Sequence, residues 1–389
     1  MPKELEGTEE KINEPKKHPE SYDVIVVGAG AAGIGVAITL IHAGIENFIV
    51  VDRKNVGASF YSWPDETRFI TPSFPSNSIG MLDLNSIAIG VSPAFTMKVE
   101  HPTGKQFASH LQSLAKYLEV PVQEKTEIKQ IEKVDDLFHL NTDGNTLLTK
   151  NLIWAAGEFL YPTKGGFVGS ELCRHTATIP AYRDLEGDNF LVIGGYESGV
   201  DAAYHLARRN KKVSLFDKAT PWEEASSDPS VSLSTYSFER IRENSFTENV
   251  DLFPNTLIDT VTLEDGTYEI KTKEGLNFKS KVQPLLATGF EGSHKLISHL
   301  FEQRDDGFPL LSDCDESTIV PGIFLCGPSV RHDNHDFCFI YKFRQRFAIV
   351  AQAIASSFDL PTDEFVDIYK SWGMYLDDLS CCGQECLTC

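Results

Sequence analysis

Apolar runs and glycines alternate in a definite order near the start of the chain. Residues 22–27 are almost entirely apolar and predict a buried strand of a parallel sheet. A glycine-rich turn follows at residues 28–33, and an apolar helix is expected over residues 31–43, with a glycine after its end. A second apolar strand is predicted at residues 48–51. Together these elements make one complete β-α-β unit.

The same order returns further along the chain. A strand is predicted at residues 190–193, a glycine-containing turn at 194–199, a helix at 200–209 and a further strand at 213–216. The two glycine turns, at 28 and 194, start 166 residues apart. This internal duplication predicts an α/β protein with two nucleotide-binding units.

Alternating strands follow each unit and lead into small residues and glycine. Asp-Gly pairs within them, at residues 143–144 and 265–266, are typical of β-hairpin turns. A late strand is expected at residues 322–327 and a long amphipathic helix over residues 339–356. The strands predicted around the two hairpins span residues 127–133, 138–142, 146–150, 256–263, 268–272 and 276–281.

Charge and composition narrow the classes of function. The 389 residues include 35 basic and 56 acidic side chains, and the formal net charge of -21 disfavours binding to nucleic acid or to an anionic membrane. Residues 24–41 are long and apolar enough to suggest a membrane span, but four glycines interrupt them and favour a strand, a turn and a helix. Residues 1–20 are polar and predict a disordered tail without a secretory signal, so we expect a cytoplasmic protein with reduced thiols.

Gly28, Gly30 and Gly33 have the spacing of a dinucleotide fingerprint. The first glycine permits a tight turn, the second lets a pyrophosphate approach the backbone, and the third brings helix and strand close together. Asp52 follows the second strand, where a carboxylate would bind ribose hydroxyls. We therefore predict a dinucleotide site with its pyrophosphate at the start of the helix, against the alternative of a glycine turn in an ordinary α/β domain.

The second turn is less regular. Gly194 and Gly199 occupy the first and third positions, but Tyr196 stands where the middle glycine is expected, beside Gly195. The tyrosine would crowd a pyrophosphate, so a module kept only for packing is the alternative to nucleotide binding. Asp217 favours NADH, whereas nearby basic residues would suit the 2′-phosphate of NADPH, and this choice stays open.

The two units, together with the stretches 154–157 (Trp-Ala-Ala-Gly) and 287–289 (Ala-Thr-Gly) and the region of Gly327, resemble the two-dinucleotide-binding-domain flavoproteins. Within that superfamily the chain is most similar to the branch of thioredoxin reductase-like, flavin monooxygenase-like and bacillithiol disulfide reductase-like proteins. The resemblance implies two Rossmann-like three-layer domains, the second inserted into the first. It places an FAD-binding domain at residues 21–160 and 290–360, an NAD(P)H-binding domain at 161–289 and a Cys-rich tail at 361–389.

The resemblance also implies the cofactors and their contacts. FAD would lie on the first domain and NAD(P)H on the second, and hydride from the nicotinamide would reduce the flavin. The residues expected to contact FAD are Gly28, Gly30, Gly33, Asp52, Arg53, Trp63, Ala156, Gly157 and Gly327. The residues expected to contact NAD(P)H are Gly194, Gly195, Ser198, Gly199, Asp217 and Gly289.

Departures from the patterns of related branches bear on the reaction. No cysteine pair follows Asp52, unlike in glutathione-reductase-type enzymes, and the second unit has no Cys-x-x-Cys, unlike in classical thioredoxin reductases. The monooxygenase signature begins at Phe167 but has Cys173 where histidine belongs, and the usual Gly-Asp near the flavin reads Gly327-Pro328. The bacillithiol disulfide reductase-like group, which also lacks a cysteine pair near the flavin, is the closest comparison.

Two further sets of residues are candidates for catalysis. The last nine residues contain four cysteines, Cys381, Cys382, Cys386 and Cys389. They predict a thiol relay that carries electrons from the flavin to an external disulfide, a soft-metal site, or an inert end. His335, in the loop after Gly327, is a candidate proton donor, against the alternative of a solvated histidine.

The sequence therefore predicts an FAD-dependent oxidoreductase that is reduced by NAD(P)H and passes electrons to a small-molecule or protein disulfide. Oxygen insertion, as in flavin monooxygenase-like proteins, is the alternative. A protein of another class, a nucleotide-binding redox sensor or a soft-metal-handling protein, also stays open. The sequence assigns no resident metal site and is compatible with a homo-oligomer.

Overall fold

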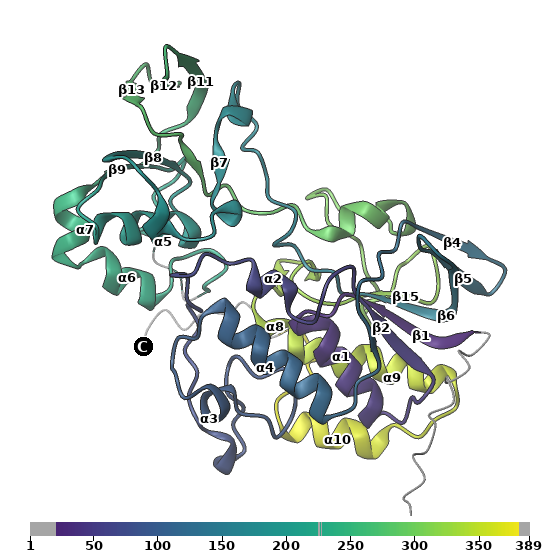
Figure 1. Ribbon diagram of the computed structural model, residues 1–389. Helices are drawn as coiled ribbons and strands as arrows, with labels where there is room; N and C mark the ends of the chain where they lie inside the picture. The colour runs from purple at the N-terminus through teal and green to yellow at the C-terminus, as the bar shows by residue number, and fades with distance from the viewer. Residues whose placement is uncertain (1–20, 225, 227, 381–389) are drawn as a thin grey trace, which may run out of the picture.

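The computed structural model describes residues 21–224, 226 and 228–380 and contains two α/β units (Figure 1). In the first unit, β1 (Tyr22–Val27) pairs in parallel with β2 (Phe48–Val51) and with β6 (Thr146–Trp154). The helix α1 (Ala31–His42) connects β1 to β2 as predicted. The sheet has the order β3-β2-β1-β6-β5-β4, with β15 also paired to β6. Its other strands are β3 (Val122–Gln123), β4 (Gln130–Val134), β5 (Leu137–Asn141) and β15 (Ile323–Leu325).

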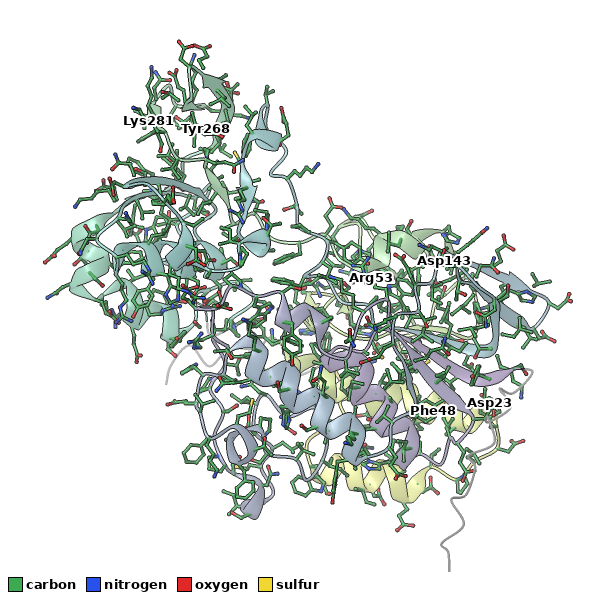
Figure 2. The ribbon with its side chains drawn as sticks, viewed as in Figure 1. Asp23, Phe48, Arg53, Asp143, Tyr268 and Lys281 are labelled. Carbon is green, nitrogen blue, oxygen red and sulfur yellow. The ribbon has the colours of Figure 1, made fainter. Side chains whose placement is uncertain are left out.

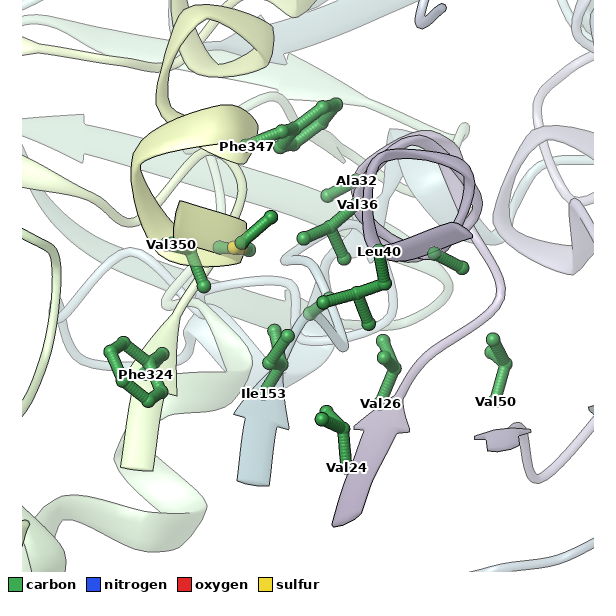
Figure 3. Packing of buried hydrophobic residues seen from close by; sticks show 14 of the residues in the cluster. Val24, Val26, Ala32, Val36, Leu40, Val50, Ile153, Phe324, Phe347 and Val350 are labelled. Carbon is green, nitrogen blue, oxygen red and sulfur yellow. The ribbon is translucent and has the colours of Figure 1, made fainter. Parts of the chain in front are cut away.

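The core of the first unit lies between this sheet, α1 and the late helix α9 (Phe347–Ser357). Val26 and Ile153 are fully buried on the sheet and face the two helices (Figure 3). Gly35 allows the helices to approach closely, because a Cβ there would lie 2.2 Å from the Phe347 ring. Strands with apolar residues on both faces are typical of a parallel sheet covered by helices.

The second unit is a smaller parallel sheet of order β10-β9-β8-β14-β7. Its β8 (Asn189–Ile193), α5 (Glu197–Ala207) and β9 (Lys212–Phe216) repeat the β-α-β order of the first unit. The helix begins at Glu197 rather than at residue 200, because Gly199 lies inside its first turn as Gly33 does in α1. The remaining elements are β7 (Arg174–His175), α6 (Thr235–Ile241), α7 (Asn244–Asn249), β10 (Val250–Phe253), β14 (Leu285–Leu286) and an antiparallel sheet of β11 (Ile258–Glu264), β12 (Thr267–Thr272) and β13 (Asn277–Ser280).

The order of the strands places the second unit inside the first. The first sheet is continuous up to Trp154, the second sheet uses strands between Arg174 and Leu286, and β15 then returns to pair with β6. In Figure 1 the inserted unit stands at the upper left and the first unit below it to the right. The fold is therefore α/β with two Rossmann-like units, the second inserted into the first, as predicted.

The long helix predicted over residues 339–356 is divided. It consists of α8 (Ile340–Phe343), a 3₁₀ turn (Arg344–Arg346) and α9. Both arginines are buried, and the Arg344 guanidinium donates to the carbonyl of Ser86 at 2.8 Å. The predicted span is therefore helical over nearly its whole length, but a 3₁₀ turn interrupts it, and the two arginines of that turn lie inside the protein, where carbonyl groups and a carboxylate bind them.

The segment predicted as a tail begins with an ordered helix. α10 (Asp363–Ser371) packs on the first unit, and its Tyr369 is almost completely buried. The Tyr369 hydroxyl lies 2.8 Å from His42 Nδ1, at the end of α1. This part of the tail prediction was wrong, because apolar residues of α10 complete the core of the first unit.

The connection between β2 and β3 holds three helices that the pattern did not predict. They are α2 (Ala58–Tyr61), α3 (Pro93–Met97) and α4 (Gly104–Tyr117). A short ribbon of β16 (Arg331–His332) and β17 (His335–Asp336) follows β15. Within the part of the chain that the structure describes, no helix is long and apolar enough to cross a membrane. Residues 24–41 form a strand, a turn and a helix, as predicted.

Candidate functional site

The first glycine turn leaves the start of α1 open. A Cβ at Gly28 would lie 2.4 Å from the carbonyl oxygen of Ala155, and one at Gly33 would lie 1.7 Å from that of Gly28, so both positions require glycine for packing. A Cβ at Gly30 would meet no atom within 4 Å. Among the described residues no side chain caps α1, and its first turn has no acidic residue. The backbone N–H groups of this turn can therefore bind an anion.

Asp52 and Arg53 follow directly at the end of β2. The backbone N–H groups of Ala29 and Lys54 both donate to the Asp52 carboxylate, each at 2.7 Å, which fixes its orientation. The Arg53 guanidinium lies 5.3 Å from the centre of the Tyr161 ring. Arg53 lies near the middle of the molecule in the view of Figure 2. This arrangement provides an acceptor for hydroxyl groups beside a cation and an aromatic ring.

A cavity of about 540 Å³ extends from the first glycine turn to the second. Aromatic side chains from the α2 region form part of its wall, including Trp63, which packs against Phe69 at 5.0 Å between ring centres. The predicted cofactor residues that line the cavity are Gly28, Gly30, Asp52, Arg53, Trp63, Ala156, Gly157 and Ser198. Seven other predicted cofactor residues do not line it: Gly33, Gly194, Gly195, Gly199, Asp217, Gly289 and Gly327.

Two of those glycines have backbone conformations that favour glycine. Gly327 has a φ of +106°, and a Cβ there would lie 3.1 Å from the Cβ of Ala32, in the first turn of α1. Gly289 has a φ of +81°, and its carbonyl accepts a hydrogen bond from the Thr163 N–H at 3.0 Å. Residues other than glycine rarely adopt such positive φ values. Gly289 and Gly327 therefore set the course of the backbone at these two positions.

The open turn and the fixed carboxylate fit the diphosphate and ribose of FAD. The start of α1 offers backbone donors and space at Gly30, and Asp52 offers acceptors one strand away. These are the groups that a dinucleotide requires, and the cavity continues past them along the aromatic wall.

The second turn repeats the packing of the first but not its openness. A Cβ at Gly194 would lie 2.3 Å from the carbonyl oxygen of Ala287, and one at Gly199 would lie 1.8 Å from that of Gly194, as in the first turn. Gly195 faces Trp222, because a Cβ there would lie 2.6 Å from the indole ring. The indole therefore occupies the space that Gly195 leaves beside Tyr196.

Side chains of the second turn bind elsewhere in their own unit. The Tyr196 hydroxyl donates to the carbonyl of Val231. Asp217 accepts hydrogen bonds from the N–H groups of Gly195 and Ala219, at 2.6 and 2.7 Å, and is buried away from the cavity. Of the turn itself, Tyr196, Glu197 and Ser198 reach the cavity wall.

Glu197 joins the start of α5 to the start of α6. Its carboxylate accepts hydrogen bonds from the Ser234 N–H at 2.5 Å and the Ser237 hydroxyl at 2.6 Å. Burial raises the pKa of this carboxyl, and the hydrogen bonds from the two serines only partly offset that effect. Glu197 therefore connects the two helices, and among the described residues no side chain caps the start of α5.

A cysteine and an acid that the site prediction missed line the same cavity. Cys338 Sγ lies 3.0 Å from Ser230 Oγ, and Lys342 Nζ donates to that oxygen at 2.7 Å and to Asp228 at 2.6 Å. Glu158 also lines the cavity, and burial raises its pKa, partly offset by the charge of Arg331. The sequence signal for Cys338 was its position just before the last predicted helix, but nothing in the pattern linked it to Ser230.

The predicted catalytic residues lie away from the cavity or outside the described residues. His335 is half-buried in the β16–β17 ribbon and does not line the cavity. Its neighbour His332 places Nε2 2.5 Å from the fully buried carboxylate of Asp315. Among the described residues no group of three or more His, Cys, Asp or Glu could hold a metal ion. The other predicted catalytic residues, Cys381, Cys382, Cys386 and Cys389, lie outside the described residues.

Comparison with known sequences decides the family. The sequence model of the pyridine nucleotide-disulphide oxidoreductase family matches residues 25–327. The chain belongs to this family. The predicted resemblance to two-dinucleotide-binding-domain flavoproteins is confirmed at that level.

Individual relatives are distant. An uncharacterized oxidoreductase, CzcO, from Bacillus velezensis is 30% identical over 192 residues, which cover 48% of this chain and 52% of CzcO. The chain thus spans about half the length of the curated CzcO relatives that it matches. Bacilliredoxin reductase Bdr from Bacillus subtilis is 22% identical over 335 residues, covering 85% of this chain and 97% of Bdr. The structure of bacillithiol disulfide reductase Bdr (YpdA) from Staphylococcus aureus superimposes with a TM-score of 0.71 at 18% identity, covering 87% and 99% of the two chains, and shows the shared fold.

Proposed function

We propose that this pyridine nucleotide-disulphide oxidoreductase binds FAD in the cavity at the first glycine turn, takes hydride from NAD(P)H and passes the electrons to a disulfide. The observation that carries the proposal is that one and the same cavity is lined by Gly30 of the open turn and by Ser198 of the second turn. A flavin and a nicotinamide must meet for hydride transfer, and a shared cavity allows that meeting.

The residues of the first unit have defined tasks in this proposal. The N–H groups at the start of α1 bind the diphosphate, and Asp52 accepts hydrogen bonds from the ribose hydroxyls. Trp63 and its aromatic neighbours exclude water from the far part of the cavity. When bound, FAD supplies the ability to accept a hydride and release two electrons.

The second unit would receive NAD(P)H along Tyr196, Glu197 and Ser198. The carboxylate of Asp217 already has two backbone donors and is covered, so the ribose of the nucleotide does not reach it in this conformation. Binding of the nicotinamide nucleotide therefore requires the contacts of Trp222 and Tyr196 to rearrange.

A disulfide acceptor is supported by the family and by the relatives whose names describe disulfide or bacilliredoxin reductases. The cysteines at the C-terminus, Cys381, Cys382, Cys386 and Cys389, stay a proposed relay. Truncation after Ser380 tests it, because disulfide turnover that is unchanged without those cysteines contradicts the relay.

Anaerobic reduction tests the proposed function. Purified protein loaded with FAD should bleach on addition of NADH or NADPH, and the flavin should stay reduced until a disulfide is added. Failure to bind FAD, or to bleach with either nucleotide, contradicts the proposal. Rapid oxygen consumption that yields an oxygenated product, with no response to disulfides, would instead indicate oxygen insertion.

A further inference from the structure

We propose that Cys338 is the thiol that attacks the substrate disulfide and that Glu158 protonates the departing thiolate. This inference rests on the proposed function and assigns its acceptor site to residues inside the cavity. Cys338 and Glu158 both line the cavity that reaches the first glycine turn. Among the cysteines that the structure describes, Cys338 is the one in the cavity wall, whereas Cys173, Cys314 and Cys326 are not.

Hydrogen bonds around Cys338 favour a reactive sulfur. Lys342 donates to Ser230 Oγ at 2.7 Å, so the serine hydroxyl proton is free to point along the 3.0 Å contact to Cys338 Sγ. Asp228, 2.6 Å from Lys342, holds the ammonium group in place. A hydroxyl donor supported by an ammonium group stabilises a thiolate when it forms.

Burial and the neighbouring positive charges act in opposite directions on the pKa of the Cys338 thiol. Burial raises the pKa of the thiol, while the Ser230 hydrogen bond and the charges of Lys342 and Arg331 lower it, and Glu158 raises it slightly. The resting residue is therefore a thiol near neutral pH, and its attack should accelerate as pH rises. A thiol of high pKa forms little thiolate, but that thiolate is a strong nucleophile.

Glu158 is the independent observation that points to a ligand. Glu158 lines the cavity, and among the described residues no donor forms a hydrogen bond with its carboxyl group. Glu158 and Cys338 line the same cavity, and the charge of Glu158 contributes to raising the pKa of the Cys338 thiol. Because burial raises its own pKa, the carboxyl retains a proton at higher pH than an exposed glutamate does. A protonated acid without a partner is suited to donate to a thiolate leaving group.

The reaction balances in two steps. After Cys338 loses its proton to solvent, its sulfur forms a bond to one sulfur of the substrate, the substrate S–S bond breaks, and the departing thiolate takes a proton from Glu158. No net oxidation or reduction occurs in this exchange. The mixed disulfide then accepts two electrons from the reduced flavin of the proposed function and two protons, which yields the second product thiol and restores Cys338. Glu158 regains from solvent the proton that it gave to the departing thiolate.

Trapping of the mixed disulfide tests the assignment without the cofactor. Full-length protein is incubated with hydroxyethyl disulfide, and peptide mapping by mass spectrometry follows each cysteine. We expect the adduct on Cys338 to form at least about tenfold faster than on Cys173, whose pKa burial and the Glu171 charge raise to about 12. An unmodified Cys338 in protein that turns over this disulfide would overturn the inference.

Matched variants separate a chemical role from a structural one. Cys338→Ser should lower disulfide-dependent NAD(P)H oxidation by more than about tenfold, whereas Cys173→Ser, outside the cavity, should leave it unchanged. Lys342→Gln should shift the pH profile of adduct formation at Cys338 to higher pH, because one of the charges that lower the thiol pKa is lost. Full turnover in Cys338→Ser contradicts the inference.

The outcomes also separate this inference from the proposed function. Wild-type protein that fails to bleach with nicotinamide nucleotides contradicts the proposed function, whatever the cysteine adducts show. Wild-type protein that bleaches and responds to the disulfide, with no adduct on Cys338, contradicts only the inference. If Cys338→Ser does not fold, adduct formation in the wild type still decides.

Discussion

At the scale of single residues, the three glycines of the first turn serve different purposes. Gly28 and Gly33 make room for neighbouring backbone, because a Cβ at these positions would lie 2.4 and 1.7 Å, respectively, from a carbonyl oxygen. Gly30 borders the cavity, and a Cβ there would meet no protein atom within 4 Å. Substitution at Gly30 therefore affects a ligand, and substitution at Gly33 affects the fold.

Two glycine variants measure this difference. Gly33→Ala should lower the free energy of unfolding by about 1–3 kcal/mol, because the new methyl group collides with the Gly28 carbonyl. Gly30→Val should lower it by less than about 1 kcal/mol but weaken FAD binding at least about tenfold, because the side chain enters the path of the diphosphate. Chemical denaturation of the apoprotein and flavin titration provide the two measurements. Tight FAD binding by Gly30→Val would contradict the assigned site.

The buried carboxylate of Asp315 supports a second prediction at this scale. Arg346, the last residue of the 3₁₀ turn before α9, is itself buried and places Nη2 2.8 Å from this carboxylate. Asp315→Ala should lower the free energy of unfolding by about 3–5 kcal/mol, because it leaves the arginine charge buried without its partner. Lys279→Ala, which removes an exposed pair with Glu269, should change it by less than about 1 kcal/mol. Equal losses in urea denaturation would contradict this account.

At the scale of elements, the starts of α1 and α5 differ although their strands and outer glycines agree. The start of α1 is open at Gly30, whereas the start of α5 is covered by Tyr196 and by the Trp222 ring against Gly195. The carboxylates after β2 and β9 bind backbone donors in the same way, yet only Asp52 borders the cavity. The two units share a fold, and the first has the more open glycine turn.

The local pattern of the sequence was sufficient to predict part of the fold. It predicted β1, α1 and β2 because a buried parallel strand is apolar throughout and the glycine spacing marks the turn. It did not predict the break at Arg344, because the partners that draw this charge inward are the carbonyl groups of residues 83–86, far away in sequence. The contact of Ser230 with Cys338 and that of Trp222 with Gly195 were missed for the same reason.

Replacing Tyr196 by glycine tests whether the tyrosine hinders nucleotide binding at the start of α5. Tyr196→Gly removes the phenol that bonds to Val231 and frees the backbone at the start of α5, so the KM for the nicotinamide nucleotide should fall several-fold. Gly195→Ala is the matched control, because its methyl group meets Trp222 at 2.6 Å and leaves the tyrosine in place. Steady-state kinetics with NADH and NADPH measure the effect. A higher KM in Tyr196→Gly would show that the tyrosine ring contributes to nucleotide binding.

At the scale of the whole molecule, polar contacts hold the two units in the orientation that forms the cavity. The hydroxyl of Thr67, in the first unit, donates to Asp201 on α5 at 2.6 Å. Asp201 also lies 2.8 Å from Arg240 Nη1, and the Tyr182 N–H donates to Glu66 at 3.0 Å. Thr67, Asp201 and Tyr182 line the cavity, so the same residues join the units and border the site.

Protonation of Asp201 at low pH should weaken the contact between the two units. Burial raises the pKa of Asp201, but hydrogen bonding to His205 and the charge of Arg240 outweigh it and lower the pKa to about 2. Because the folded pKa is below the ordinary value of 3.8, the carboxylate stabilises the fold above about pH 4, and its contribution of about 2 kcal/mol is lost as pH falls toward 2. The free energy of unfolding, measured between pH 5 and pH 2.5, should therefore fall more steeply in the wild type than in Asp201→Asn. Parallel curves for the two proteins would contradict the role assigned to this carboxylate.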